Sequence, residues 1–173
     1  MELVDLEIGR HDWATLYCGC LGFAGHLASR LSRLARATTE EEASVDGIHA
    51  LTESQSIVTA TLPVVSVALA ALADDVQEPA RRRFAELILG VLCSDGQELT
   101  PEFDGRDVLV ECEDMVRGAL WLLYREVLSA TSVGTGSYAF EILSIVENDK
   151  QRLELVGTLA GQRIAADLRH PPR

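Results

Sequence analysis

Apolar residues recur every three to four positions through the middle of the chain, over 58–72 and again over 84–91. This is the spacing of one face of an α-helix. Asp74 and Asp75 separate the two runs, and Pro79 follows, which suits the first turn of a helix because its missing N–H would have no partner there. A connection of about five residues predicts that the two helices pack as antiparallel neighbours.

Pro63 interrupts the first of these runs. A proline inside a helix removes one backbone hydrogen bond and clashes with the preceding turn. The helix is therefore either kinked at Pro63 or begins just before it. We favour a start near Thr61, since Thr59 and Thr61 are both suitable N-cap residues.

Similar periodicity predicts an all-α protein of about seven helices in antiparallel hairpins. Residues 1–10 are expected to be a loose lead-in, 11–169 a single domain and 170–173 a tail. No segment alternates between polar and apolar residues as a strand does. Besides the central pair, we expect a short helix from His11 that bends at Gly22 and Gly25 into a longer one, and helices over 39–53, 108–129, 138–147 and 150–168, with connecting loops at 93–106 and 130–137.

Two segments are weakly self-similar, residues 69–92 and 141–164. Each joins a helix end, an acidic or Asn-containing turn and an Arg near the start of the next helix, and Asp75 could pair with Arg81 across the first turn. Stacked helical hairpins of about 40 residues are the architecture of α-solenoids. With its DWATL (12–16) and TATLPVVSVALAAL (59–72) segments, the chain resembles bacterial HEAT/armadillo-like proteins.

That resemblance covers 11–92 and, more loosely, 136–168, whereas 95–135 departs from it. It implies either a short HEAT-like α-solenoid or an irregular helical bundle. It also implies a role in protein binding rather than chemistry, because short proteins of this kind in bacteria can be immunity proteins that cap a toxin.

Composition limits the class of protein. The chain has 173 residues, 47% of them hydrophobic, and five prolines, which is typical of a folded domain with a substantial core. The uncharged stretch 60–73 is shorter than the roughly 18–20 residues that span a bilayer. The acidic start of the chain does not resemble a signal peptide. We expect a cytoplasmic protein that does not enter the membrane.

The charge distribution indicates the kind of partner. The formal net charge is −12, and residues 39–80 contain eight acidic side chains but neither Lys nor Arg. Such a surface repels phosphate backbones and anionic membranes, which argues against nucleic-acid binding. It attracts a basic protein, whose association it would accelerate.

The cysteines and histidines suggest neither a disulfide nor a metal site. Cys18 and Cys20 are too close in sequence to bridge each other comfortably, and Cys93 and Cys112 show no partner spacing. His26 and His49 have no Cys or carboxylate at an obvious ligand spacing. We therefore expect free cysteines that act as small apolar residues, and no metal or other cofactor.

The acidic segment around loop 93–106 is the first candidate site. Loops longer than about 12 residues in a compact domain are often functional. An exposed Phe103 could anchor a basic partner, surrounded by carboxylates. A divalent-cation site at these carboxylates is the weaker alternative to an acidic, solvated face. The predicted partner-binding residues are Glu102, Phe103, Asp104, Asp107, Glu111 and Asp114.

The aromatic residues form the second candidate site, a pocket between helices that carry Trp13, Trp121 and Tyr124. His11 beside Asp12 could act as a general base there, although a helix cap is the simpler interpretation. The chain has no G-x-S-x-G motif, and the glycines in 132–137 follow a predicted helix rather than a strand, so they predict a linker.

Two functional hypotheses follow. The first is a protein–protein interaction module that binds a basic partner, as an immunity protein, inhibitor or adaptor. The second is a helical-bundle enzyme or small-ligand-binding protein that uses the aromatic pocket. A homodimer held by the apolar helix 108–127 is a further possibility.

Overall fold

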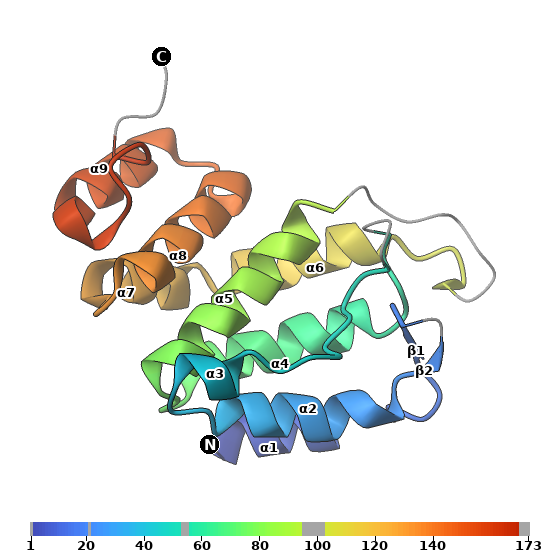
Figure 1. The fold of residues 1–173 in the computed structure, drawn as a ribbon. Helices are drawn as coiled ribbons and strands as arrows, with labels where there is room; N and C mark the ends of the chain where they lie inside the picture. The colour runs from blue at the N-terminus through green and yellow to red at the C-terminus, as the bar shows by residue number, and fades with distance from the viewer. Residues whose placement is uncertain (1, 21, 53–55, 95–102, 170–173) are drawn as a thin grey trace.

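The computed structural model describes residues 2–20, 22–52, 56–94 and 103–169. It confirms the all-α class, and an irregular helical bundle describes its arrangement (Figure 1). The helices in the described residues are α1 (Glu2–Gly9), α2 (Gly25–Ala35), α3 (Glu40–Ala43), α4 (Thr61–Ala73), α5 (Glu78–Leu92), α6 (Val108–Gly118), α7 (Leu120–Ser129), α8 (Val133–Val146) and α9 (Lys150–Ala160). A single 3₁₀ turn, Gly161–Arg163, follows α9.

Helix α4 lies at the centre of the bundle, in contact with α1, α5 and α6. It begins at Thr61, as its sequence predicts, so that Pro63 falls in the first turn, where a missing N–H costs nothing. The Thr61 hydroxyl accepts the N–H of Val58 at 3.0 Å and donates to the carbonyl of Ala50 at 2.5 Å. The first turn of α4 is thereby fixed to the segment before it.

The N-terminal residues differ from the loose lead-in that their sequence suggests. They form α1, which packs on α4 with Val4 fully buried. The carboxylate of Asp74, just beyond the end of α4, accepts the N–H of Leu3 at 3.0 Å and of Val4 at 3.4 Å. This long-range contact satisfies donors that have no partner inside a helix.

A two-stranded hairpin takes the place of the helix predicted from His11. Its strands are β1 (Tyr17–Cys18) and β2 (Gly22–Phe23). The predicted helix 39–53 is also shorter, because only α3 is helical and Gly47 has a φ of +81°. The chain then runs as irregular structure toward α4, with a single bridge between Leu51 and Ile57.

The helix predicted over 108–129 is two helices, since α6 and α7 are separated at Ala119. Gly118 weakens the helix at this point. The break also lets α6 pack on α4 while α7 packs on α8.

Helix α8 begins within the predicted linker 132–137 and includes residues 133–137 of it. Its N-cap is Ser132, whose hydroxyl accepts the N–H of Thr135 at 3.1 Å. The last helix is shorter than predicted, because α9 ends before Gly161, which has a φ of +55°.

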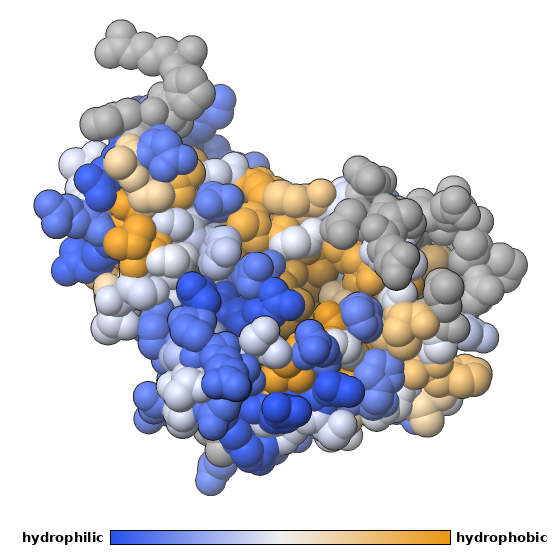
Figure 2. Space-filling model, in the orientation of Figure 1, coloured by the Kyte–Doolittle hydropathy of each residue, from blue (hydrophilic) through white to orange (hydrophobic). Residues whose placement is uncertain are grey.

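Figure 2 shows hydrophilic side chains over the lower part of one face, around α3, and apolar side chains across its middle. An ion pair between Arg82 and Glu40 connects α5 to α3 on the surface. None of the described helices is both long and apolar enough to cross a membrane.

Candidate functional site

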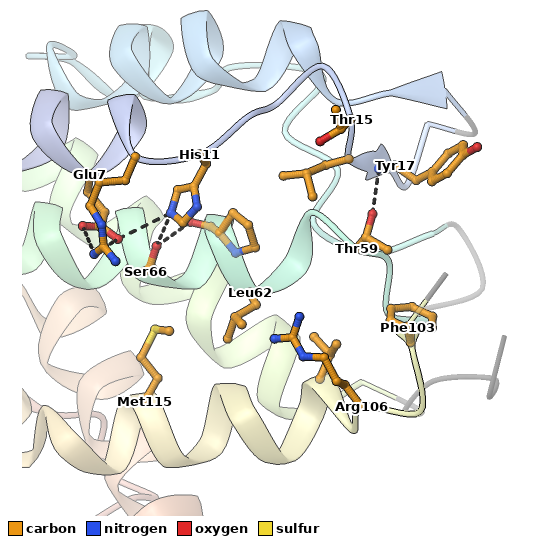
Figure 3. Close-up of a pocket in the computed structure, with 14 residues that line it drawn as sticks. Glu7, His11, Thr15, Tyr17, Thr59, Leu62, Ser66, Phe103, Arg106 and Met115 are labelled. Atoms are coloured by element: carbon orange, nitrogen blue, oxygen red, sulfur yellow. Dashed lines mark hydrogen bonds and ion pairs between the residues drawn. The ribbon is translucent and has the colours of Figure 1, made fainter. Parts of the chain in front are cut away.

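A cavity of about 580 Å³ lies beside the central helix (Figure 3). Its walls come from the end of α1, the segment that leads into β1, the first turns of α4, and α6 with the residues just before it. Its size is in the range of small-molecule sites, roughly 300–1,000 Å³. Its lining combines apolar walls with charged residues at both ends.

The walls of the cavity are mainly apolar. Leu62 and Met115 face each other from α4 and α6, and Figure 3 shows both side chains directed into the space. Leu16, Pro63 and Val108 complete this part of the lining. An apolar group that enters the cavity would therefore lose most of its contact with water, which is the main source of affinity in such sites.

One end of the cavity is a charged cluster made by the last turn of α1, the two residues that follow it, and α4. Arg10 donates from Nη1 to both carboxylate oxygens of Glu7, at 3.0 and 2.8 Å. Nε2 of His11 lies 3.4 Å from Glu7 Oε1 and 3.0 Å from the hydroxyl of Ser66. Glu7 is buried and His11 is half-buried, whereas the side chain of Arg10 is mostly exposed.

This cluster does not have the geometry of a nucleophilic triad. In a triad, the carboxylate and the serine contact opposite ring nitrogens of the histidine, whereas here Glu7 and Ser66 both lie at Nε2. The hydroxyl of Ser66 also donates to the carbonyl of Pro63 at 3.0 Å. The arrangement is suited to orienting a bound group rather than to activating Ser66.

The opposite end of the cavity carries Arg106, close to the half of the lining that includes Tyr17 and Thr59 (Figure 3). Nε of Arg106 donates to Glu111 at 2.8 Å, while the hydroxyl of Thr59 accepts the N–H of Tyr17 at 2.7 Å. The lining thus contains two guanidinium groups, each paired with a carboxylate: Arg10 with Glu7 in the lining and Arg106 with Glu111 just outside it.

Glu7 is held in its ionised form. Burial raises the pKa of this carboxyl, but the hydrogen bonds from Arg10 and the positive charge of Arg10 outweigh burial and lower the pKa below the ordinary 4.5. A carboxylate with a lowered pKa stabilises the fold above the pKa of the unfolded chain, and this contribution is lost as the pH falls through the folded-state pKa.

We therefore expect Glu7→Gln to reduce the acid sensitivity of the protein. Between pH 6 and pH 3, the melting temperature of the wild type should fall more steeply than that of the variant, so that the advantage of the wild type at pH 6 narrows below about pH 4.5, the ordinary value for a glutamate. Thermal melts across this range measure the difference, and all other acidic residues are common to both proteins. Parallel curves would contradict the ionic role of Glu7.

The structure uses most of the predicted partner-binding acids in local contacts. Asp107 is the N-cap of α6 and accepts the N–H of Val110 at 3.2 Å. Glu111 pairs with Arg106, and Asp114 pairs with Arg117. Asp104 is exposed, with a φ of +50°. Glu102 lies outside the described residues.

Phe103, which was expected to be an exposed anchor, is only 8% exposed. Its ring lines the cavity next to Arg106 instead of projecting into solvent (Figure 3). The side chain is therefore part of the candidate site, in a different role from the one its sequence context suggested.

The three residues of the predicted aromatic pocket do not come together. Trp13 is buried and donates its indole N–H to the carbonyl of Ile8 at 2.8 Å. Trp121 and Tyr124 lie edge to face on α7, with ring centroids 5.5 Å apart. Figure 1 places α7 at the opposite end of the molecule from the segment between α1 and β1 that carries Trp13.

The sequence contains a signal for only part of this site. Glu7, Arg10 and His11 follow the i, i+3, i+4 spacing that puts side chains on one helix face, which could have been recognised had residues 1–10 been predicted as helical. Ser66, Arg106 and Met115 join the cavity from distant parts of the chain. No local pattern distinguishes them.

Residues that could hold a metal lie elsewhere, on the hairpin and α2. Potential ligand atoms of Cys18, Cys20 and His26 all lie within 4.8 Å of one another. The sequence suggests no ligand-spaced partner for His26, and the structure corrects this by placing Cys18 and Cys20 beside it. The signal is a Cys-x-Cys pair followed by a histidine, which the β1–β2 hairpin brings together.

No protein family, curated protein or solved structure gives a significant match to this chain.

Proposed function

We propose that the protein is a binding protein whose cavity takes an amphipathic ligand with an apolar body and an anionic head group. The observation that carries this proposal is the cavity of about 580 Å³, which has apolar walls and an arginine at each end. The absence of an activated nucleophile in the Glu7–His11–Ser66 cluster favours binding over catalysis at this site.

Arg10 is the residue we assign to the head group. Its contacts with Glu7 use Nη1 alone, so Nε and Nη2 can donate to an incoming carboxylate or similar anion. Its mostly exposed side chain stands where a ligand would enter, while Glu7 fixes its position. The apolar body of the ligand would then lie between Leu62 and Met115.

The test compares decanoate with decanol, which has the same apolar chain but no charge. Decanoate should raise the melting temperature, since a ligand that binds only the folded state stabilises it. Decanol should have a smaller effect. The variant Arg10→Gln should weaken decanoate binding by about tenfold or more, because a hydrogen bond to a charged group contributes roughly 1.5–3 kcal/mol.

Two further variants complete the design. Met115→Trp fills the cavity and should abolish binding of both probes, whereas Arg33→Gln, at an exposed position on α2, should bind decanoate as the wild type does. Isothermal titration measures the affinity of the wild type and of the three variants for decanoate. The proposal fails if the wild type does not bind decanoate, or if Arg10→Gln and Arg33→Gln bind it equally well.

A second candidate function is the binding of a basic protein partner, as an immunity protein, inhibitor or adaptor. The specific observation in its favour is Trp121, which is 79% exposed on α7. Exposed tryptophans are enriched among the residues that dominate protein interfaces, and the net charge of −12 would attract a basic protein. Affinity purification at low and high salt, with Trp121→Ser as the control bait, distinguishes such a partner from nonspecific ionic binding.

A further inference from the structure

Three side chains with metal-binding atoms converge at the tip of the β1–β2 hairpin. Cys18 is on β1, Cys20 is in the turn that follows, and His26 is in the first turn of α2. Nε2 of His26 lies 3.5 Å from Sγ of Cys18 and 3.9 Å from Sγ of Cys20. This group takes no part in the cavity lining described above.

These separations match the edges of a tetrahedral zinc site. With Zn–S bonds of about 2.3 Å and Zn–N bonds of about 2.0 Å, a tetrahedral angle puts sulfur and nitrogen about 3.5 Å apart. The observed separations of 3.5 and 3.9 Å lie within about 0.4 Å of this value. Only small side-chain movements are needed for all three atoms to reach one ion.

We propose that Cys18, Cys20 and His26 bind Zn²⁺ through two thiolates and one imidazole nitrogen. Thiolate and imidazole ligands together select zinc over hard cations such as Mg²⁺ and Ca²⁺. Cys18 is buried and Cys20 is exposed, so the ion would lie at the boundary of the core, with its fourth position toward solvent. Binding releases the two thiol protons to the buffer and involves no change of oxidation state.

The backbone around the cluster is already held in place. Gly19 donates its N–H to the carbonyl of His49 at 3.1 Å, and a Cβ at Gly19 would lie 1.8 Å from the carbonyl oxygen of Leu51. The N–H of Cys20 points to Sγ of Cys18 at 3.3 Å. A hydrogen bond to a ligand atom is the kind of supporting contact that orients metal ligands.

Zinc bound here would connect the hairpin to α2. It would also fix the strand that carries Tyr17, which precedes Cys18 and lines the cavity. The proposal does not depend on the function proposed for that cavity, because the ligand atoms and the test are separate.

The experiment uses the full chain, reduced and freed of metal with a chelator, and titrated with Co²⁺ as a spectroscopic substitute for Zn²⁺. The wild type should bind one Co²⁺ per chain and show the thiolate-to-cobalt charge-transfer absorption of a tetrahedral sulfur-containing site. Excess Zn²⁺ should displace the Co²⁺, and Mg²⁺ should not. Zn²⁺ should also raise the melting temperature.

Single substitutions identify the ligands. Cys20→Ser and His26→Gln should each weaken Co²⁺ binding by about 100-fold or more, since even the loss of a residue that only supports a ligand costs roughly 10- to 100-fold. Cys20 is exposed, so Cys20→Ser should fold like the wild type. Cys93→Ser, at another exposed cysteine, and His49→Ala, beside the cluster, should both retain the absorption band and the affinity.

Three results would overturn the proposal: Co²⁺ binding without the charge-transfer band, equal binding by Cys20→Ser and Cys93→Ser, or loss of the band in His49→Ala. A Cys18–Cys20 disulfide in protein kept under reducing conditions, detected by mass spectrometry, would also overturn it, because the two thiols would then be unavailable to a metal.

Discussion

Replacing Arg81 by methionine is expected to lower the free energy of unfolding by about 3 kcal/mol, at the lower end of the range for breaking a buried ion pair. Arg81 is 17% exposed and its partner Glu126 only 5%, and Nη1 of Arg81 lies 3.0 Å from Glu126 Oε1. The same guanidinium donates to the carbonyls of Leu72 and Asp74, both at 2.8 Å.

The cost is large because one side chain serves several groups. Methionine removes one of the two cations that contact the buried carboxylate of Glu126, and it removes a donor from two carbonyls at the end of α4 that have no partner within the helix. Arg125 compensates in part, since its Nη2 lies 3.1 Å from Glu126 Oε1 and 2.6 Å from the Leu72 carbonyl. For this reason we expect the lower end of the range. Urea denaturation followed by circular dichroism measures the difference.

Arg82→Met is the matched control, one residue away on the same helix. Arg82 pairs with Glu40 on the surface, and both side chains are largely exposed, so its loss should change stability by less than about 1 kcal/mol. The double variant Arg81→Met with Glu126→Leu should recover part of the loss, because no buried carboxylate is then left with a lost partner. Equal destabilisation by Arg81→Met and Arg82→Met would show that the buried ion pair contributes no more to the free energy of unfolding than the surface ion pair does.

The Arg81–Glu126 pair is a contact that the sequence does not predict. The turn between α4 and α5 suggested that Arg81 pairs with Asp75, six positions away. The ion pair that it makes is with Glu126, 45 positions away. A local pattern can show that an arginine follows a turn, but it cannot show which distant helix will approach it.

The elements that could be predicted are those that local interactions determine. The start of α4 at Thr61 follows from the steric demands of Pro63, and the all-α class follows from the 3.6-residue periodicity. By contrast, α1 depends on Asp74, which is 71 positions from Leu3. The division of 108–129 into α6 and α7 depends on which neighbours they pack against. The cavity is likewise only partly predictable from local sequence. The residues at one end are neighbours in and just after α1, whereas those at the other end come from distant parts of the chain.

Gly136→Ala is expected to lower the free energy of unfolding by about 3 kcal/mol, the upper end of the usual cost of inserting a methyl group into a packed site. The sequence suggests that Gly136 belongs to a flexible linker, but it lies buried in the first turn of α8. A Cβ there would lie 2.1 Å from the main-chain carbonyl oxygen of Arg163 and 3.1 Å from Cβ of Ala130. A backbone atom cannot rotate away, so the segment after α9 must move.

Gly90→Ala separates this steric effect from the general preference of helices for alanine. Gly90 lies exposed within α5, and a Cβ there meets nothing within 4 Å. Alanine at this position should therefore stabilise the protein by about 0.5–1 kcal/mol. At roughly 2–4 °C per kcal/mol for a chain of this size, Gly136→Ala should melt about 6–12 °C below the wild type and Gly90→Ala slightly above it. If both variants melt above the wild type, the close approach of the Arg163 carbonyl to Gly136 does not limit stability, and the contact between α8 and the 3₁₀ turn after α9 yields to a methyl group.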